Sequence, residues 1–185
     1  MESKALAALT DVLDSKWIYS IFMATFSISR LQFLRGDFSG KQQPLRPPWS
    51  PSETEFTAKC ERCSECIKAC PEGILEKGRG GFPQVNFKKG ECTFCGICAD
   101  RCLNNTLQQI ENIPPWQIKA YIETNCLAKQ GIICVSCHEN CELEAIQFPL
   151  SRLVAVPMVN LEECNGCGAC YQACPVTAIT IRFDC

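Results

Sequence analysis

Apolar positions along the chain form short runs that predict small strands and hairpins. Within residues 73–87, two such runs flank the turn sequence GRGG, and residues 144–160 repeat this pattern around a longer turn. Turn residues between two apolar runs are typical of a β-hairpin. Between the two hairpins, residues 116–122 (WQIKAYI) alternate apolar and polar side chains, as a half-buried strand does. The pattern therefore predicts two hairpins and one further strand.

No apolar run reaches the roughly 20 residues of a membrane-spanning helix. The longest, residues 17–28, has the length of a signal-peptide core, but no basic segment precedes it and no small-residue cleavage site follows it. We therefore expect a cytoplasmic protein without a secretion signal. The formal net charge of −2 also gives no basic surface for nucleic acid.

Cysteine dominates the composition, with 17 cysteines in 185 residues. This content indicates either a disulfide scaffold or a metal protein. All but Cys185 fall into four quartets along the chain. The quartets are Cys60, Cys63, Cys66 and Cys70; Cys92, Cys95, Cys98 and Cys102; Cys126, Cys134, Cys137 and Cys141; and Cys164, Cys167, Cys170 and Cys174.

Three of these quartets have the spacing C-x2-C-x2-C-x3-C, and Pro71 and Pro175 follow the first and the last of them. This is the bacterial iron–sulfur run, in which three close cysteines bind one cubane cluster and the fourth binds the neighbouring cluster. Zinc sites use paired C-x2-C units with longer spacers. Disulfides require export to an oxidising compartment. The spacing therefore favours [4Fe-4S] clusters.

Crossed ligation gives each cluster three cysteines from one quartet and one from another. We name the resulting ligand sets A to D. In the first half, set A is Cys60, Cys63, Cys66 and Cys102, and set B is Cys70, Cys92, Cys95 and Cys98. In the second half, set C is Cys126, Cys134, Cys137 and Cys174, and set D is Cys141, Cys164, Cys167 and Cys170.

The third quartet departs from this motif. Gly131 stands three residues before Cys134, where the first cysteine is expected. Cys126 supplies the missing ligand through the longer loop CLAKQGIIC, which adds a fourth cluster to the three regular ones. The alternative is a labile or three-iron cluster at set C. His138, the only histidine, lies in the same region and is either bonded to a cluster sulfur or solvated.

Other residues near the quartets have two interpretations each. Gly96 and Gly168 follow the second cysteine of a quartet, where a side chain would crowd the cluster, although they could be ordinary turn glycines. Trp49 and Trp116 each follow a Pro-Pro pair and are candidate partner-binding residues; the alternative is packing within their own domain. Residues 52–55 (SETE) form a capping-box pattern that predicts a short helix before the first quartet.

The repeated order in each half is cysteine loop, short helix, hairpin, cysteine loop, short helix and strand. It predicts an α+β fold of two tandem bacterial 2[4Fe-4S] ferredoxin-like domains with short helices and hairpins, after an N-terminal helical or irregular extension. We place the extension at residues 1–50 and the domains at 51–110 and 111–185. Neither half has apolar sequence for a large core, so we expect the clusters to replace it.

Four segments carry a closer resemblance: LRPPWSP, RGGFPQVNFKKGECTFC, CLAKQGIICVSCHENC and CNGCGACYQACPVTAIT. Through these segments, the region of residues 29–183 resembles the NapF family, which consists of ferredoxin-type accessory proteins of periplasmic nitrate reductase systems. The resemblance implies a cytoplasmic, non-enzymatic protein that binds the catalytic subunit NapA before export and assists its maturation, at the stage of iron–sulfur assembly. The alternatives are a ferredoxin-type electron carrier or electron-input subunit of a redox complex, and an iron–sulfur sensor.

Residues 1–22 lie outside this resemblance, and Met23 stands just before it. We therefore expect translation to start at Met23 rather than at Met1. Residues 29–36 (SRLQFLRG) resemble the S-R-R-x-F-L segment at which such proteins often begin, with Leu31 in place of the second arginine. No apolar core follows, so we expect no twin-arginine export signal.

Overall fold

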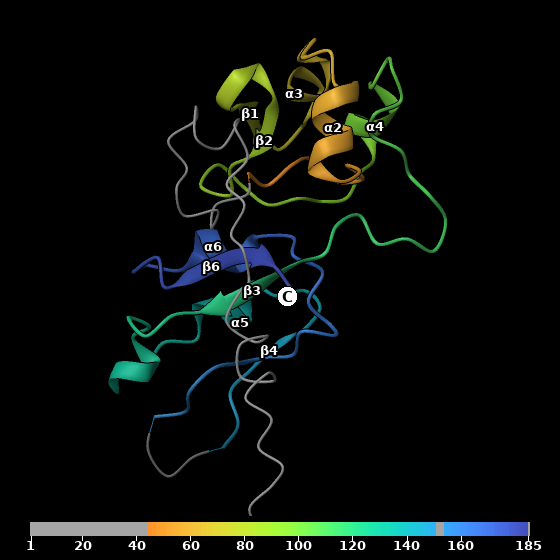
Figure 1. Cartoon of the computed structure of the whole chain (residues 1–185). Coiled ribbons are helices and arrows are strands. Elements are labelled where there is room, and N and C mark those ends of the chain that lie inside the picture. Colours follow the sequence, from red (N-terminus) through yellow and green to blue (C-terminus); the bar gives the residue numbers. More distant parts are fainter. Residues whose placement is uncertain (1–43, 151–153, 185) are drawn as a thin grey trace, which may run out of the picture. The chain divides into compact units, whose positions relative to one another are not determined.

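A computed structural model describes residues 44–150 and 154–184, which belong to one compact unit (Figure 1). Residues 1–43 of the expected N-terminal extension, the choice between Met1 and Met23, and Cys185 lie outside the described residues, whereas residues 44–50 of the extension are described. In this part of the chain, no helix is both long and apolar enough to cross a membrane.

The elements are short and follow the predicted order, except that the strand expected at the end of the first half is missing. The first half contains α2 (Glu53–Lys59), α3 (Glu65–Ala69), β1 (Leu75–Lys77), the 3-10 helix η1 (Arg79–Gly81), β2 (Pro83–Val85) and α4 (Ile97–Asp100). The second half contains β3 (Ile118–Ile122), the 3-10 helix η2 (Ala128–Gln130), α5 (Ser136–Glu139), β4 (Ile146–Gln147), β5 (Met158–Val159), α6 (Ala169–Ala173) and β6 (Ile179–Phe183). Helices and strands alternate in both halves, so the α+β prediction is confirmed.

Both predicted hairpins are present. Strands β1 and β2 pair antiparallel with Leu75 opposite Val85, and the turn between them is η1. Strands β4 and β5 pair antiparallel with Ile146 opposite Val159. In each pair an apolar residue of one strand faces an apolar residue of the other, which sets the register.

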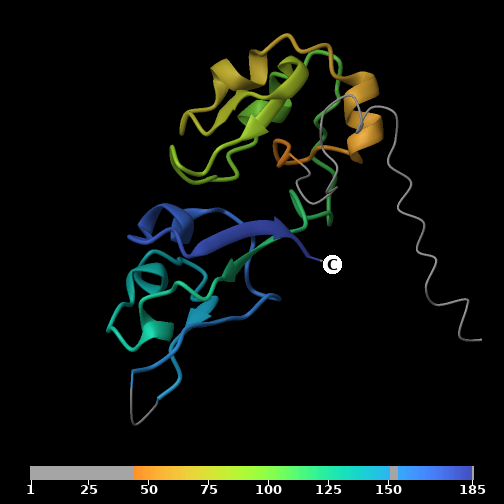
Figure 2. The same cartoon turned by 60° about the vertical axis from the view of Figure 1, so that its left-hand side comes forward.

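The predicted strand at 116–122 is β3, and it pairs antiparallel with β6, the last strand of the second half. Ile118 lies opposite Phe183, and Ile122 lies opposite Ile179. Ile118 and Ala120 are buried and the residues between them are less so, as the alternation predicts. Figures 1 and 2 show β3 in green and β6 in dark blue side by side.

The prediction of a strand after the second cysteine loop of the first half is wrong. Residues 101–117, which follow α4, form turns and coil. This segment contains Asn105 and Asn112 with positive φ and a Pro-Pro pair, all of which interrupt a strand. In place of a strand pair, the Val85 N–H donates to the Leu45 carbonyl at 2.7 Å.

The helix predicted from SETE is α2, but the capping box does not form. Ser52 is the N-cap residue and makes no side-chain capping bond; its hydroxyl lies 3.2 Å from the Thr54 hydroxyl instead. Arg46 holds the start of α2, because its guanidinium pairs with the first helical residue, Glu53. Phe56 points from α2 into the core and is 1% exposed.

The apolar core consists of two small clusters. The first contains Phe56, Ile74, Leu75, Val85, Phe87, Leu107 and Ile118, together with Cys66, Cys98 and Ala99. The second contains Ala120, Ile146, Ile179 and Cys170. Both groups of core residues thus contain cysteines, so the predicted iron–sulfur sites adjoin the apolar core.

Candidate metal centres

Set A gathers around the packed helices α3 and α4. Burial raises the pKa of the Cys66 thiol to about 12, and the nearby charges of Cys98, Cys60, Cys102 and Cys63 raise it further. The three set partners of Cys66 are all among these neighbours. A hydrogen bond from the Asn104 side chain to the Lys59 carbonyl ties the turn after Cys102 to the residue before Cys60.

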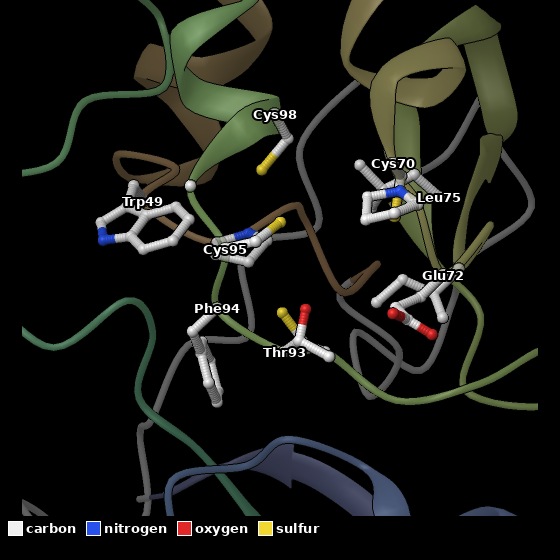
Figure 3. A pocket seen from close by; sticks show the side chains of 13 residues that line it. Trp49, Cys70, Glu72, Leu75, Thr93, Phe94, Cys95 and Cys98 are labelled. Atoms are coloured by element: carbon white, nitrogen blue, oxygen red, sulfur yellow. The ribbon is translucent and has the colours of Figure 1, made fainter.

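Set B lines a pocket that also includes Trp49, Phe94 and Leu75. Figure 3 shows Cys95 and Cys98 on one side of this pocket and Cys70 on the other. Burial raises the pKa of Cys98 to about 12 and that of Cys92 to about 11, and the charge of Cys70 also raises both. The fourth cysteine of the first quartet therefore lies with the first three of the second.

Set C lines a second pocket with all four of its cysteines. Burial raises the pKa of Cys137 to about 11, with further contributions from Cys126 and Cys134. The long loop after Cys126 is folded as η2, and the Asn125 side chain donates to the Val176 carbonyl at 3.1 Å. This bond connects the residue before Cys126 to the turn that carries the fourth member of the set.

Set D lines a larger pocket with all four of its cysteines. Burial raises the pKa of Cys170 to about 12, and the charges of Cys167, Cys164 and Cys141 raise it further. The Lys119 ammonium of β3 donates to the Cys164 carbonyl at 2.6 Å, so the strand pair positions this loop. The structure thus brings together the members of all four predicted sets.

The donors fit iron–sulfur cubanes better than single metal ions. Within residues 44–150 and 154–184, no three Cys, His, Asp or Glu side chains have the arrangement of a site for one metal ion. Ligands of a cubane surround a four-iron core, whereas the four sulfurs of a zinc site all lie about 2.3 Å from one ion. Cluster binding would also stabilise the thiolate forms that burial disfavours in the free chain.

Two of the sulfurs accept hydrogen bonds from backbone N–H groups that follow them in the chain, five residues on in one case and four in the other. The Cys102 sulfur accepts from the Leu107 N–H at 3.5 Å, and the Cys174 sulfur accepts from the Ala178 N–H at 3.2 Å. Both are fourth cysteines of their quartets. Hydrogen bonds to ligand sulfurs are one of the means by which proteins set cluster potentials.

The regular cysteine loops share a backbone signature around their second cysteine. The residue before it has positive φ in all three loops (Arg62, Phe94 and Gly166), as does the residue after it (Ser64, Gly96 and Gly168). The third quartet lacks both features, since Val135 has φ −128° and Ile133 does not have positive φ. Its irregular spacing is therefore matched by a different loop conformation.

All four quartets share a second signature, which the sequence interpretation missed. The residue three positions after the fourth cysteine has positive φ and donates its N–H to that cysteine's carbonyl. These residues are Gly73, Asn105, Glu144 and Thr177, with N···O distances of 3.1, 3.0, 2.9 and 3.3 Å. Among these residues only Gly73 strongly favours positive φ, and the four positions share no residue type from which the turn could have been predicted.

Gly96 and Gly168 are required for backbone reasons that differ from the predicted one. Both have left-handed φ, of +80° and +93°, at the start of α4 and α6. A Cβ on Gly96 would overlap the Gln109 side chain, and one on Gly168 would overlap the Phe87 ring. Neighbouring side chains therefore occupy the space next to these glycines.

His138 and the two tryptophans all have contacts within the chain. The His138 ring shares a hydrogen bond with the Ile146 carbonyl, with 2.6 Å between Nδ1 and oxygen, so this nitrogen is engaged by neither a sulfur nor solvent. Trp49 packs against the first core cluster, and Trp116 donates to the Asn165 carbonyl at 2.9 Å. Partner binding by Trp49 and Trp116 stays a prediction.

Two family models match the chain. Residues 59–106 match a 4Fe-4S dicluster domain, and residues 157–180 match a 4Fe-4S binding domain. The first match spans all eight cysteines of the first two quartets and the second spans the last quartet. The third quartet lies between the two matches, in agreement with its irregular loop.

Curated relatives extend the similarity over most of the chain. Ferredoxin-type protein NapF of Escherichia coli (strain K12) is 42% identical over 156 residues, which cover 84% of this chain and 94% of the relative. Ferredoxin-type protein NapF of Haemophilus influenzae is 45% identical over 171 residues, covering 86% and 97%. Methylamine utilization ferredoxin-type protein MauM of Methylorubrum extorquens is 31% identical over 156 residues, covering 75% and 71%.

Proposed function

Because the chain belongs to the NapF family of ferredoxin-type proteins, we propose that it is a cytoplasmic accessory protein of a periplasmic nitrate reductase system. In this proposal it binds the catalytic subunit NapA before export and assists its maturation at the stage of iron–sulfur assembly. The near-complete coverage of the NapF relatives carries the proposal, because it includes the irregular third quartet as well as the regular ones.

The four cysteine sets are the proposed ligands of four [4Fe-4S] clusters. Such clusters, when bound, exchange single electrons. The chain would contribute the thiolates that hold each cluster, of which those of Cys66, Cys98 and Cys170 are buried. It would also contribute apolar neighbours such as Phe56 and Ile74 that exclude water, and the N–H groups of Leu107 and Ala178 that donate to ligand sulfurs. We assign no catalytic turnover of a substrate to any of these residues.

Cluster binding would also change the charge that a partner meets. Four thiolates around an oxidised core of charge +2 contribute about −2 per cluster, which takes the formal charge of the chain from −2 to about −10. A basic surface on the partner would therefore strengthen association. Screening of exposed charges makes such binding sensitive to salt.

The test is capture of NapA precursor that retains its export signal by anaerobically purified, cluster-loaded protein. We expect capture by the loaded protein and at least severalfold less by protein from which iron has been removed. Mature, cluster-containing NapA serves as the matched control and should bind more weakly. Equal capture of precursor and mature NapA contradicts a maturation role, and no capture of either contradicts the partner assignment.

A second candidate function is that of a ferredoxin-type electron carrier. It is favoured by the hydrogen bond from the Cys92 N–H to the Cys167 carbonyl, which brings a loop of set B against a loop of set D. Stopped-flow mixing of reduced protein with isolated redox enzymes tests it. Oxidation of all proposed clusters at a catalytically competent rate by one such enzyme, without NapA binding, would replace the maturation proposal.

A further inference from the structure

The cysteine sets of the two halves meet at one main-chain contact. The Cys92 N–H donates to the Cys167 carbonyl at 2.8 Å, and Cys167 is among the residues whose charges raise the pKa of Cys92. Cys92 is the first cysteine of set B, and Cys167 belongs to set D. Glu91, Cys92, Thr93 and Phe94 accordingly line the same pocket as the four cysteines of set D.

Aromatic packing holds this contact in place. The Trp116 ring lies edge-on to Phe87 at 5.9 Å and to Phe94 at 5.7 Å between ring centroids, and its Nε1 donates to the Asn165 carbonyl at 2.9 Å. Phe87 in turn fills the space beside Gly168. Three rings of the chain thus fix the loop that begins at Cys92 against the loop that contains Cys167.

Within each half, the two sets are also neighbours. Helices α3 and α4 pack together and bring Cys98 of set B close enough to Cys66 of set A to raise its pKa. Helices α5 and α6 pack together and do the same for Cys137 of set C and Cys170 of set D. The neighbour relations therefore run from A to B, from B to D and from D to C.

We propose that the contact between Cys92 and Cys167 joins the four sets into one electron path in the order A, B, D, C. This inference rests on the cluster ligation proposed above. With clusters bound, one electron would cross the contact between Cys92 and Cys167, from the cluster held by set B, which would be oxidised, to the cluster held by set D, which would be reduced. No bond or proton moves, and a low-potential one-electron donor supplies the first electron.

The order of the path has a specific consequence. Sets A and C each neighbour one other set and are the two ends of the path, while B and D each neighbour two sets and are its inner members. An electron that enters at either end must pass the contact between Cys92 and Cys167 to reach the other half. The irregular set C thereby occupies one end of the path, next to the exposed side chains of Ile132 and Ile133.

The test uses full-length variants that keep two chosen sets. The first variant removes sets A and C, and the matched control removes sets A and D. The substitutions for set A are Cys63→Ala and Cys66→Ala, those for set C are Cys134→Ala and Cys137→Ala, and those for set D are Cys164→Ala and Cys170→Ala. Each variant is reconstituted anaerobically, its iron is counted, and its electron paramagnetic resonance spectrum is recorded after reduction with dithionite.

Both variants should hold about 8 iron atoms, which is two cubanes. The variant that keeps B and D should show a spectrum split by interaction between its two reduced clusters, and the variant that keeps B and C should show loss of that splitting. Full iron content without splitting in the B and D variant overturns the electron path while leaving cluster ligation intact. Iron-free but folded variants overturn the cluster ligation itself.

A second measurement covers variants that fail to fold. In the intact chain, Trp116→Leu loosens the contact without removing a cysteine, and Phe148→Leu is the matched control because Phe148 packs on His138 in the second half. We expect loss of part of the magnetic interaction in Trp116→Leu and none in Phe148→Leu, at equal iron content. Identical spectra for these two variants overturn the inference.

Discussion

Arg46 connects the segment before α2 to both α2 and the first hairpin, so its replacement should destabilise the first half strongly. Its guanidinium forms two hydrogen bonds with Glu53, Nε to Oε2 at 2.8 Å and NH2 to Oε1 at 2.6 Å. Its NH1 donates to the Pro83 carbonyl at 3.0 Å. The guanidinium also lies over the rings of Phe56 and Phe82, at 5.0 and 5.4 Å from their centroids.

The expected cost follows from these contacts. The Arg46 side chain is only 10% exposed and that of Glu53 30%, so the pair is partly withdrawn from water. Removing one partner of a fully buried ion pair costs about 3–5 kcal/mol, and we take about 3 kcal/mol for Arg46→Met because Glu53 keeps some solvent contact. Arg46→Lys should cost roughly half as much, since lysine keeps the charge and loses the two-bond geometry.

The assay is the rate at which the anaerobic, cluster-loaded protein loses its cluster absorbance at a fixed urea concentration. If about half of 3 kcal/mol is expressed in the unfolding barrier, Arg46→Met loses absorbance about 10-fold faster than the unsubstituted chain. Lys59→Ala is the matched control in the same helix. It removes an exposed pair with Glu55 (2.6 Å) and should change the rate by less than about twofold.

An Arg46→Met rate within about twofold of that of the unsubstituted chain would refute this reasoning, because the buried pair would then give no net stabilisation. Adding Glu53→Gln identifies the cause of a large effect. The carboxylate of Glu53 has no cation beside it in Arg46→Met, so the double variant should recover part of the lost stability. A double variant that is no slower to unfold would assign the effect to lost packing on the Phe56 and Phe82 rings.

Three further predictions follow from the described residues. Cys102→Ser should remove the cluster of set A and lower the iron content by about 4 atoms although Cys60 and its two companions remain, whereas unchanged iron would contradict crossed ligation. Phe56→Ala should cost about 3–5 kcal/mol by opening a cavity, and Ile133→Ser, at an 84% exposed position, should stay within about 0.5 kcal/mol in the same unfolding assay. Thr177→Asn should stabilise by about 0.5–1 kcal/mol, because Asn tolerates the left-handed backbone (φ 48°) better than a β-branched residue; faster unfolding would contradict this.

The hairpins and β3 could be predicted because their signals are local. GRGG between two apolar runs specifies a turn with left-handed glycines, and Gly80 and Gly81 indeed have φ of +67° and +79°. Apolar and polar side chains alternate over residues 116–122 because one face of the strand is buried, and this alternation is visible in the sequence itself. Each of these signals is confined to one short segment of the chain, residues 73–87, 116–122 or 144–160.

Pairings between distant segments could not be predicted in the same way. The register of β3 with β6 joins Ile118 to Phe183, and no residue in either strand specifies the other. Residues 101–117 were expected to contain a strand by analogy with the second half, but the turn conformations at Asn105 and Asn112 direct the chain elsewhere. Repetition of the cysteine motif therefore did not imply repetition of every strand.

The cysteine sets were predictable because their spacing describes the loop and helix that surround them. The contact between the halves was not, since the Cys92 N–H and the Cys167 carbonyl are main-chain groups. Trp116 stood out in the sequence as a candidate partner-binding residue, and the structure shows that it also packs on Phe87 and Phe94. A side chain that stands out in a sequence can thus mark a junction within the chain.

The third quartet shows which part of the cysteine unit tolerates change. Its loop has neither of the left-handed residues that flank the second cysteine elsewhere, yet Glu144 repeats the left-handed turn found three residues after every fourth cysteine. The three-cysteine loop only has to wrap its own site, so a longer path from Cys126 through η2 can replace the regular one. The fourth cysteine must reach the neighbouring set, and its direction depends on the turn that follows it. We therefore expect insertions in the loop before Cys134 to be tolerated, and changes that prevent a positive φ at Glu144 to disturb set D.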